Sequence, residues 1–252
     1  MKTIVIIPAR LNSSRLPNKV ILDICGKPMI QHVYESTKKV KNISEVYIAT
    51  DSEKVRQICE KFTSHVIMTS NEHESGTDRL AEAVENIDCD NVINVQGDEP
   101  LISSELISNL ANSLESKDID MISAMYRIKT VSDLKSKNSV KVTVDKKLNA
   151  LYFSRSIIPW DRDELDSFLT EKEIIPSSLN FFKHIGIYGY KKEFLKKYSL
   201  MEQTYLEKLE KLEQLRVLEN GYRIKMLETD YEPVGVDVQE DLEKVRKIIE
   251  CR

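Results

Sequence analysis

The sequence predicts an α/β fold built on a mainly parallel, doubly wound sheet. Short aliphatic and β-branched runs alternate along the chain with longer segments whose apolar residues recur at helical spacing. This alternation is typical of βαβ units, in which a helix connects each strand to the next parallel strand. A strand-rich stretch at about 120–154 interrupts the alternation. We therefore expect one domain over residues 1–252 that carries a β-rich insertion.

The first half of the chain supplies most of the expected parallel sheet. The run from Thr3 to Ile7 is short and wholly apolar after its first residue, as a buried first strand requires. Asn91 to Val95 has the same character and is the expected central strand. The other expected strands are 45–49 and 66–68, and the expected helices are 29–40, 53–62, 78–86 and 104–114.

The second half is predicted to hold the insertion and two closing helices. Strands are expected at 121–127, 140–144, 150–154, 184–190 and 223–227, and helices at 205–219 and 239–249. The leucines of 205–219 recur every three residues, which drifts around a helix and favours a broad buried face over a coiled-coil seam. We expect the insertion at 120–154 to project from the sheet and to cover a site or meet a second subunit.

Charge and composition exclude several classes of function. The net charge is −4 and the isoelectric point is about 5.7, whereas nucleic-acid and anionic-membrane binders usually carry a basic surplus. Because no apolar run is long enough for a signal peptide or a membrane span, a cytoplasmic protein is expected. The cysteines have no zinc-ligand spacing and are interpreted as buried or incidental thiols: Cys25, Cys59, Cys89 and Cys251.

A basic loop follows the first strand. It brings Arg10, Arg15 and Lys19 within ten residues, at the edge of the sheet where open α/β folds bind ligands. Arginine forks and a lysine suit a triphosphate, although a solvated basic loop would have the same composition. The loop contains neither GxGxxG nor GxxxxGK[ST], which disfavours Rossmann dehydrogenases and P-loop kinases.

Two acidic positions complete a candidate metal site. Asp98 follows the central strand and is the expected magnesium ligand, while Glu99 beside it could equally be a turn acid. Asp237 follows Gly235 just before the last helix and could by itself be a turn residue. Together, Asp98 and Asp237 would form a paired-carboxylate site.

Polar residues in the second half suggest a site for a hydroxyl-rich ligand. His184 and Tyr188 are four apart on an expected strand, so both side chains should lie on one face. Glu213 and Gln214 lie among leucines on the expected long helix. Hydrogen-bonded core residues and a solvated helix face are the alternatives.

Seven motifs in order along the chain resemble those of the 3-deoxy-manno-octulosonate (Kdo) cytidylyltransferases. The motifs are PARLNSSRLPNK (8–19), HESGTDRLAEA (73–83), NVQGDEPLI (94–102), YFSRSIIP (152–159), HIGIYGY (184–190), LEKLEQLRVLENG (209–221) and GVDVQEDLEKVR (235–246). The resemblance implies a Rossmann-like nucleotidyltransferase fold, a homodimer and a Mg²⁺-dependent reaction. In that reaction CTP and Kdo give CMP-Kdo and pyrophosphate for lipopolysaccharide or capsule.

The resemblance also implies a role for individual residues. Lys19, Asp98 and Asp237 would be catalytic, and both aspartates would bind the metal. The nucleotide would contact Ala9, Arg10, Arg15, Lys19, Ser75 and Gly76. The sugar would contact Gln96, Arg155, His184, Tyr188, Glu213 and Gln214.

Two departures from the family pattern lie beside the expected site. Asn18 stands where the family usually has glycine, which predicts a stiffer or differently turned loop, and Val238 stands where it usually has threonine. Other substrates therefore stay open: a sialic acid or 8-amino-Kdo. A catalytically silent nucleotide-binding subunit is disfavoured because Lys19, Asp98 and Asp237 are all present.

Overall fold

The computed structural model describes residues 1–11, 13, 15–73, 76–163, 165–176 and 178–250. Within these ranges one sheet contains the strands in the order β11-β7-β10-β6-β1-β4-β5, and β8 and β9 extend it from β10. The strands of this sheet are β1 (Thr3–Pro8), β4 (Glu45–Thr50), β5 (Val66–Met68), β6 (Asn91–Asn94), β7 (Met121–Arg127), β8 (Lys141–Val144), β9 (Ala150–Ser154), β10 (Phe182–Lys191) and β11 (Lys225–Glu228). A separate two-stranded sheet is formed by β2 (Asp23–Ile24) and β3 (Lys27–Pro28).

Along the central path from β11 to β5 the pairing is mainly parallel, as the sequence predicts. Strand β1 pairs in parallel with both β4 and β6, and β5 and β11 also pair in parallel with their neighbours. Strand β10 is antiparallel to β6, β7 and β8. This mixed, mainly parallel sheet confirms the predicted fold class.

Helices cover both faces of the sheet. The helices are α1 (Met29–Lys38), α2 (Glu53–Cys59), α3 (Gly76–Val84), α4 (Ser104–Ser113), α5 (Val131–Lys135), α6 (Leu165–Glu171), α7 (Lys192–Ser199), α8 (Tyr205–Glu210), α9 (Gln214–Glu219) and α10 (Gln239–Glu250), with a 3₁₀ turn η1 (Lys19–Ile21). In β1, Val5 and Ile7 join the core formed with α1, α2 and α4, whereas Ile4 and Ile6 join the core formed with α3 and α7. This double coverage explains why β1 reads as an uninterrupted apolar run. None of the helices within the described ranges is long and apolar enough to cross a membrane.

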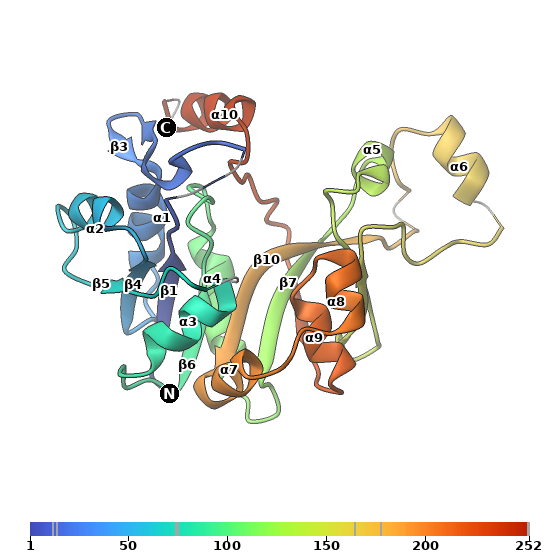
Figure 1. Ribbon diagram of the computed structural model, residues 1–252. Helices are drawn as coiled ribbons and strands as arrows, with labels where there is room; N and C mark the ends of the chain where they lie inside the picture. Colours follow the sequence, from blue (N-terminus) through green and yellow to red (C-terminus); the bar gives the residue numbers. More distant parts are fainter. Residues whose placement is uncertain (12, 14, 74–75, 164, 177, 251–252) are drawn as a thin grey trace.

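The strand-rich stretch differs from the expected projecting insertion. Strand β7 lies inside the sheet between β10 and β11, and only the β8–β9 hairpin extends from the end of β10. Figure 1 shows α5 and α6 on a segment that extends away from the sheet. Ile128, Leu134, Phe168 and Phe181 share a small separate core in this segment.

The expected single helix at 205–219 is wrong, because α8 and α9 meet at a corner. Lys211 adopts a left-handed conformation with φ 55 there. Glu207 and Arg216 would face opposite sides of a continuous helix, about two and a half turns apart. The corner instead joins them in a buried ion pair, with Arg216 Nε 2.8 Å from Glu207 Oε2 and Nη2 2.6 Å from Oε1. The corner also places Gln214 at the start of α9.

We predict that this ion pair stabilises the corner strongly. Glu207→Leu should lower the free energy of unfolding by about 3–5 kcal/mol, since it leaves the Arg216 guanidinium buried without its anion. The double change Glu207→Leu, Arg216→Met should recover most of that loss in urea unfolding. Glu193→Ala, which removes an exposed partner of Lys196, is the control and should cost under about 1 kcal/mol. A Glu207→Leu variant that is as stable as the wild type would contradict the prediction.

Candidate active site

The basic loop after β1 forms one wall of a cavity of about 360 Å³. The cavity is lined by Pro8, Arg10, Ser13, Arg15, Lys19, Val20, Gly76, Gln96, Gly97 and Asp98. Ala9 is fully buried beneath this loop, where its N–H donates to the carbonyl of Ala49 on β4 at 2.8 Å. Ser75, another expected nucleotide contact, lies outside the described residues. Of the other expected nucleotide residues, all but Ala9 line the cavity: Arg10, Arg15, Lys19 and Gly76.

Gly97 allows the opposite wall to approach this loop. A Cβ atom at position 97 would lie 2.8 Å from the carbonyl oxygen of Pro8, closer than such contacts occur. Only glycine therefore permits the chain after β6 to pack against the end of β1. This close approach brings Asp98 next to the residues of the basic loop.

Lys19 joins the two candidate metal-binding carboxylates. Its Nζ lies 2.6 Å from Asp98 Oδ2 and 3.0 Å from Asp237 Oδ1. Burial lowers the pKa of Lys19, but the charges and hydrogen bonds of the two carboxylates outweigh burial and raise the pKa above its ordinary value. Arg15 adds a second cation, with Nη2 3.0 Å from Asp237 Oδ1. Lys19 is therefore a charged ammonium group held between two anions.

Asp237 is positioned by the chain on either side of it. The N–H of Val236 donates to the backbone carbonyl of Asp98 at 2.9 Å, which ties the segment before α10 to the segment after β6. The Val236 side chain is fully buried in a small core with Leu242 of α10. Asp241 Oδ2 accepts the N–H of Asp237 at 3.0 Å. These contacts fix Asp237 opposite Asp98 without using its own carboxylate.

The carboxylate pair suits a magnesium ion shared with a nucleotide. Two aspartates converge on one cationic group, and their side chains are 31% and 49% exposed, which leaves room for water and phosphate oxygens. Magnesium is usually bound in this way, by one or two carboxylates plus substrate phosphates. Within the described ranges no group of three or more His, Cys, Asp or Glu side chains could hold a metal ion. A metal at this site would thus take its remaining ligands from substrate and water.

Asn18, which stands where the family usually has glycine, adopts a backbone conformation that glycine favours. Its φ is 57 and its ψ is 25, in the left-handed region that favours glycine. Asparagine is one of the few other residues that visit this region readily. The turn that leads into Lys19 is therefore made with asparagine at modest cost.

A second cavity of about 280 Å³ adjoins the first, and both are lined by Gly76 and Gln96. The lining of this second cavity is Gly76, Thr77, Asn94, Gln96, Gly186, Tyr188, Lys211, Leu212, Glu213 and Gln214. Four of the six residues expected to contact the sugar are therefore brought together here: Gln96, Tyr188, Glu213 and Gln214. His184 and Arg155 are not among its lining residues. The His184 ring packs against the Tyr188 ring, with centroids 5.4 Å apart.

Two buried polar atoms of the second cavity have no hydrogen-bond partner within the described residues. They are Asn94 Oδ1, an acceptor, and Gln214 Nε2, a donor. Gln214 is held by Tyr188, whose hydroxyl donates to Gln214 Oε1 at 3.2 Å. Because a buried polar group is costly unless it is paired, these atoms fit a ligand that offers both donors and acceptors. Asn94 was not expected at the site from the sequence, where it read as a strand residue.

Glu213 connects the second cavity to α3. Thr77 Oγ1 donates to Glu213 Oε2 at 2.9 Å, and the Tyr198 hydroxyl donates to the Glu213 carbonyl at 2.7 Å. Burial raises the pKa of Glu213, and the hydrogen bond from Thr77 opposes this only in part. The interpretation of Glu213 as part of a solvated helix face is therefore wrong, because the side chain is hydrogen-bonded inside the protein.

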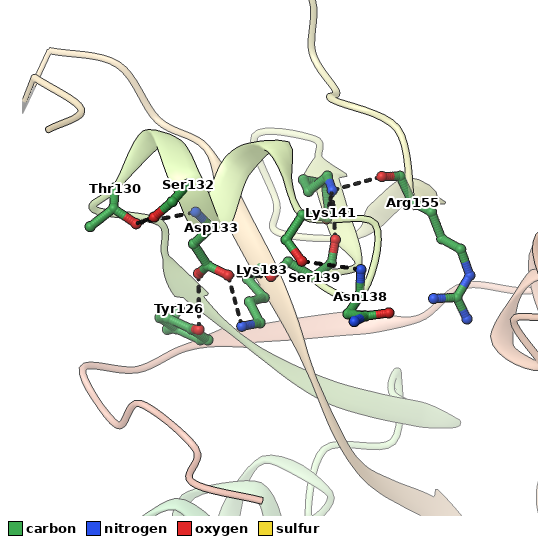
Figure 2. A network of polar contacts seen from close by, with 10 residues as sticks. Tyr126, Thr130, Ser132, Asp133, Asn138, Ser139, Lys141, Arg155 and Lys183 are labelled. Carbon is green, nitrogen blue, oxygen red and sulfur yellow. Dashed lines mark hydrogen bonds and ion pairs between the residues drawn. The ribbon is translucent and has the colours of Figure 1, made fainter. Parts of the chain in front are cut away.

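Arg155 is anchored at the end of β9 by a network of polar contacts (Figure 2). Its Nε donates to the Glu210 carbonyl at 2.8 Å, and Nη1 donates to the Lys137 carbonyl at 3.1 Å. The carbonyl of Arg155 accepts from Nζ of Lys141, a fully buried lysine that also donates to the carbonyls of Ser136 and Ser139. All three N–H bonds of the Lys141 ammonium are thereby used.

This network connects Arg155 to the main sheet. Asp133 on α5 accepts from Lys183 of β10 at 3.0 Å and from the hydroxyl of Ser139. Figure 2 shows the chain of contacts from Lys183 through Asp133 and Ser139 to Lys141 and Arg155. No local pattern in the sequence indicates this network, since a lysine in an alternating strand reads as solvent-exposed.

Glu99 is a buried carboxyl next to the aspartate pair. Its Oε2 is enclosed and has no partner within the described residues. Burial, and secondly the charge of Asp98, raise the pKa of Glu99 to about 7. Glu99 does lie in a turn, with its N–H 3.3 Å from the carbonyl of Gln96, but it is not the solvated turn acid that the sequence allows.

Known proteins match the chain along nearly its whole length. The family model for cytidylyltransferases matches residues 4–225. A 3-deoxy-manno-octulosonate cytidylyltransferase of Geotalea uraniireducens is 50% identical over 97% of this chain and 98% of its own. A structure of CMP:2-keto-3-deoxy-manno-octonic acid synthetase complexed with CTP has a TM-score of 0.90 and 39% identity, covering 100% of this chain and 99% of the other.

More distant structures share the fold alone. The 4-diphosphocytidyl-2C-methyl-D-erythritol synthase of Anaerococcus prevotii has a TM-score of 0.63 at 15% identity, covering 99% of this chain and 96% of its own. The fold is thus common to enzymes with different substrates, whereas the high identity over full length distinguishes one group. The chain belongs to the cytidylyltransferase family and, within it, to the 3-deoxy-manno-octulosonate cytidylyltransferases.

Proposed function

We propose that this enzyme uses magnesium to transfer CMP from CTP to the anomeric hydroxyl of Kdo, releasing pyrophosphate. The observation that carries the proposal is the pair of adjoining cavities, one basic and one neutral, with a common wall at Gly76 and Gln96. The first offers cations to phosphates, and the second offers an unpaired buried acceptor and donor to hydroxyls. A substrate in each cavity would place the two reacting groups at the common wall.

The residues of the first cavity act on the triphosphate. Arg10, Arg15 and Lys19 neutralise the β- and γ-phosphates, so charge that builds up on the departing pyrophosphate is met by fixed cations. A magnesium ion held by Asp98 and Asp237 would neutralise the α-phosphate and lower the pKa of the attacking hydroxyl. When phosphates enter, Lys19 can turn part of its hydrogen bonding from the carboxylates to phosphate oxygens.

The residues of the second cavity orient the sugar. The anomeric oxygen attacks the α-phosphorus, the bond from that phosphorus to the leaving oxygen breaks, and the hydroxyl proton passes to solvent. No covalent enzyme intermediate is needed, so the chain contributes mainly position and charge. Gln214 donates and Asn94 accepts hydrogen bonds, while Lys211 of the same cavity supplies positive charge for the sugar carboxylate. Arg155 does not line this cavity and stays an expected contact of the sugar.

The reaction sets the cellular context that we propose. CTP is a cytoplasmic nucleotide, so the enzyme would work in the cytoplasm, and its activated sugar would serve lipopolysaccharide or capsule synthesis. The adjoining neutral cavity gives no reason to prefer a sialic acid or 8-amino-Kdo over Kdo.

Pyrophosphate release tests the function directly. With magnesium present, we expect release from CTP with Kdo and much weaker release with ATP or GTP, because the segments at Ala9 and at Gly76 should fit a small pyrimidine. Sialic acid and 8-amino-Kdo serve as competing acceptors. Faster release with either of these acceptors would show that it, and not Kdo, is the preferred substrate. No release with any acceptor would indicate a silent nucleotide-binding subunit.

The two ends of the site should respond differently to substitution. Asp98→Asn or Asp237→Asn should each remove most of the turnover, and the double variant should be little worse, because the two carboxylates act as a unit. Gln214→Ala or His184→Ala should raise the KM for the sugar by about tenfold, roughly 1.4 kcal/mol, and leave the KM for CTP unchanged. Steady-state kinetics with each substrate varied separately measures both effects. Near-normal turnover of Asp237→Asn would refute the paired site.

We propose that the enzyme is a homodimer that pairs through its strand-rich region at 120–154. The exposed side chain of Leu151 on β9, 61% accessible, lies in this region, and the β8–β9 hairpin leaves an edge that a second subunit can cover. Light scattering at micromolar concentration should give twice the chain mass of 29.1 kDa. Leu151→Glu should favour the monomer, whereas a monomeric wild type would contradict the proposal.

A further inference from the structure

The hydroxyl of Ser123, on β7, reaches three polar atoms of β10. Its Oγ lies 2.8 Å from His184 Nε2, 2.8 Å from the carbonyl oxygen of Ile187 and 3.2 Å from that of Ile185. Ser123 is fully buried, so bulk solvent does not reach this point. The three contacts must therefore be satisfied by the protons that these groups carry themselves.

The proton count determines which atom donates in each contact. A serine hydroxyl has one proton, and a backbone carbonyl can only accept. If that proton pointed to His184, Oγ would face the Ile187 carbonyl at 2.8 Å with no hydrogen between two oxygens. The hydroxyl therefore donates to the carbonyls, and its lone pair faces His184. Nε2 of His184 must then carry a hydrogen and donate to Ser123.

The rest of the imidazole follows from this contact. Burial lowers the pKa of His184 to about 3, so the ring is neutral at physiological pH and carries one ring hydrogen. With that hydrogen on Nε2, Nδ1 is an acceptor. Nδ1 makes no hydrogen bond within the described ranges. It is also not fully enclosed by protein atoms, so it remains open to a partner from outside the chain. The ring itself is held between Phe153 and Tyr188, at centroid distances of 5.0 and 5.4 Å.

The same hydroxyl also stabilises an irregularity of β10. The register between β7 and β10 shifts between Ile185 and Tyr188, where two extra residues of β10 are inserted. Both carbonyls that face Ser123 belong to this bulge, and Gly186 within it lines the second cavity. Bulges commonly re-aim side chains next to active sites. Ser123 thus holds the bulge and the His184 ring through one atom.

We infer that Ser123 is a positioning residue that fixes His184 as its Nε2–H tautomer and so presents Nδ1 as an acceptor for a hydroxyl group of the sugar. The part that concerns the sugar rests on the proposed function, whereas the tautomer does not. His184 accordingly accepts a hydrogen bond and neither donates one to the substrate nor transfers a proton. An acceptor at Nδ1 therefore favours sugars that carry a hydroxyl group at the position that Nδ1 contacts.

Nitrogen NMR of the histidine side chains tests the tautomer in the free enzyme. The chain has four histidines, and the His184 signals are assigned with the variant His184→Gln. At neutral pH we expect Nδ1 to resonate as an unprotonated nitrogen and Nε2 as a protonated one. The reverse pattern, or an average of both, in the wild type would overturn the inference. This measurement needs no Ser123 variant and no substrate.

Two Ser123 variants test the positioning role. Ser123→Ala should shift the His184 signals towards a mixture of tautomers and raise the KM for the sugar by about tenfold, with the KM for CTP unchanged. Ser123→Thr keeps the hydroxyl on a β-branched residue suited to a strand and should restore both readouts. Ser113→Ala, on α4, removes a hydroxyl bonded to the Asn109 carbonyl and should change neither. A mixed tautomer with an unchanged KM for the sugar would refute the contact between Nδ1 and the substrate.

Discussion

The active site depends on one interaction, the ammonium group of Lys19 between Asp98 and Asp237. These residues come from the loop after β1, the turn after β6 and the segment before α10, so they are far apart in the sequence. Two carboxylates at this spacing would repel each other, and the cation offsets that repulsion. The close approach at Gly97 and the backbone bond from Val236 to Asp98 then hold the three segments in place.

The two cavities are positioned by different kinds of structure. The first lies over the ends of β1 and β6, where apolar residues on both faces fix the backbone. The second is bounded by β10 and by the α8–α9 corner, which polar contacts hold in place: the pair Glu207–Arg216 and the bond from Thr77 to Glu213. The first cavity is thus fixed by the core, and the second by a small number of buried polar groups.

This difference explains how far the sequence could predict the structure. Apolar runs predicted β1 and β6, and with them the positions of Lys19 and Asp98, because burial on both faces of a sheet leaves a clear local pattern. The helix at 205–219 was wrong because Glu207 and Arg216 pair only when the helix breaks, which helical periodicity cannot reveal. No local sequence pattern marks the roles of Ser123, Asn94 and Lys141 either, since each role depends on partners from other elements.

Buried polar residues of this kind can set specificity without touching the substrate. Lys141 uses its three N–H bonds on backbone carbonyls, and one of these is the carbonyl of Arg155. Burial lowers the pKa of Lys141, but a lysine with every donor paired has little to gain from losing its proton. Lys141 and Ser123 both act through backbone carbonyls at irregular points of the sheet, the end of β9 and the bulge of β10. A related enzyme could therefore change its sugar by altering such supporting residues while the residues that line the first cavity stay the same.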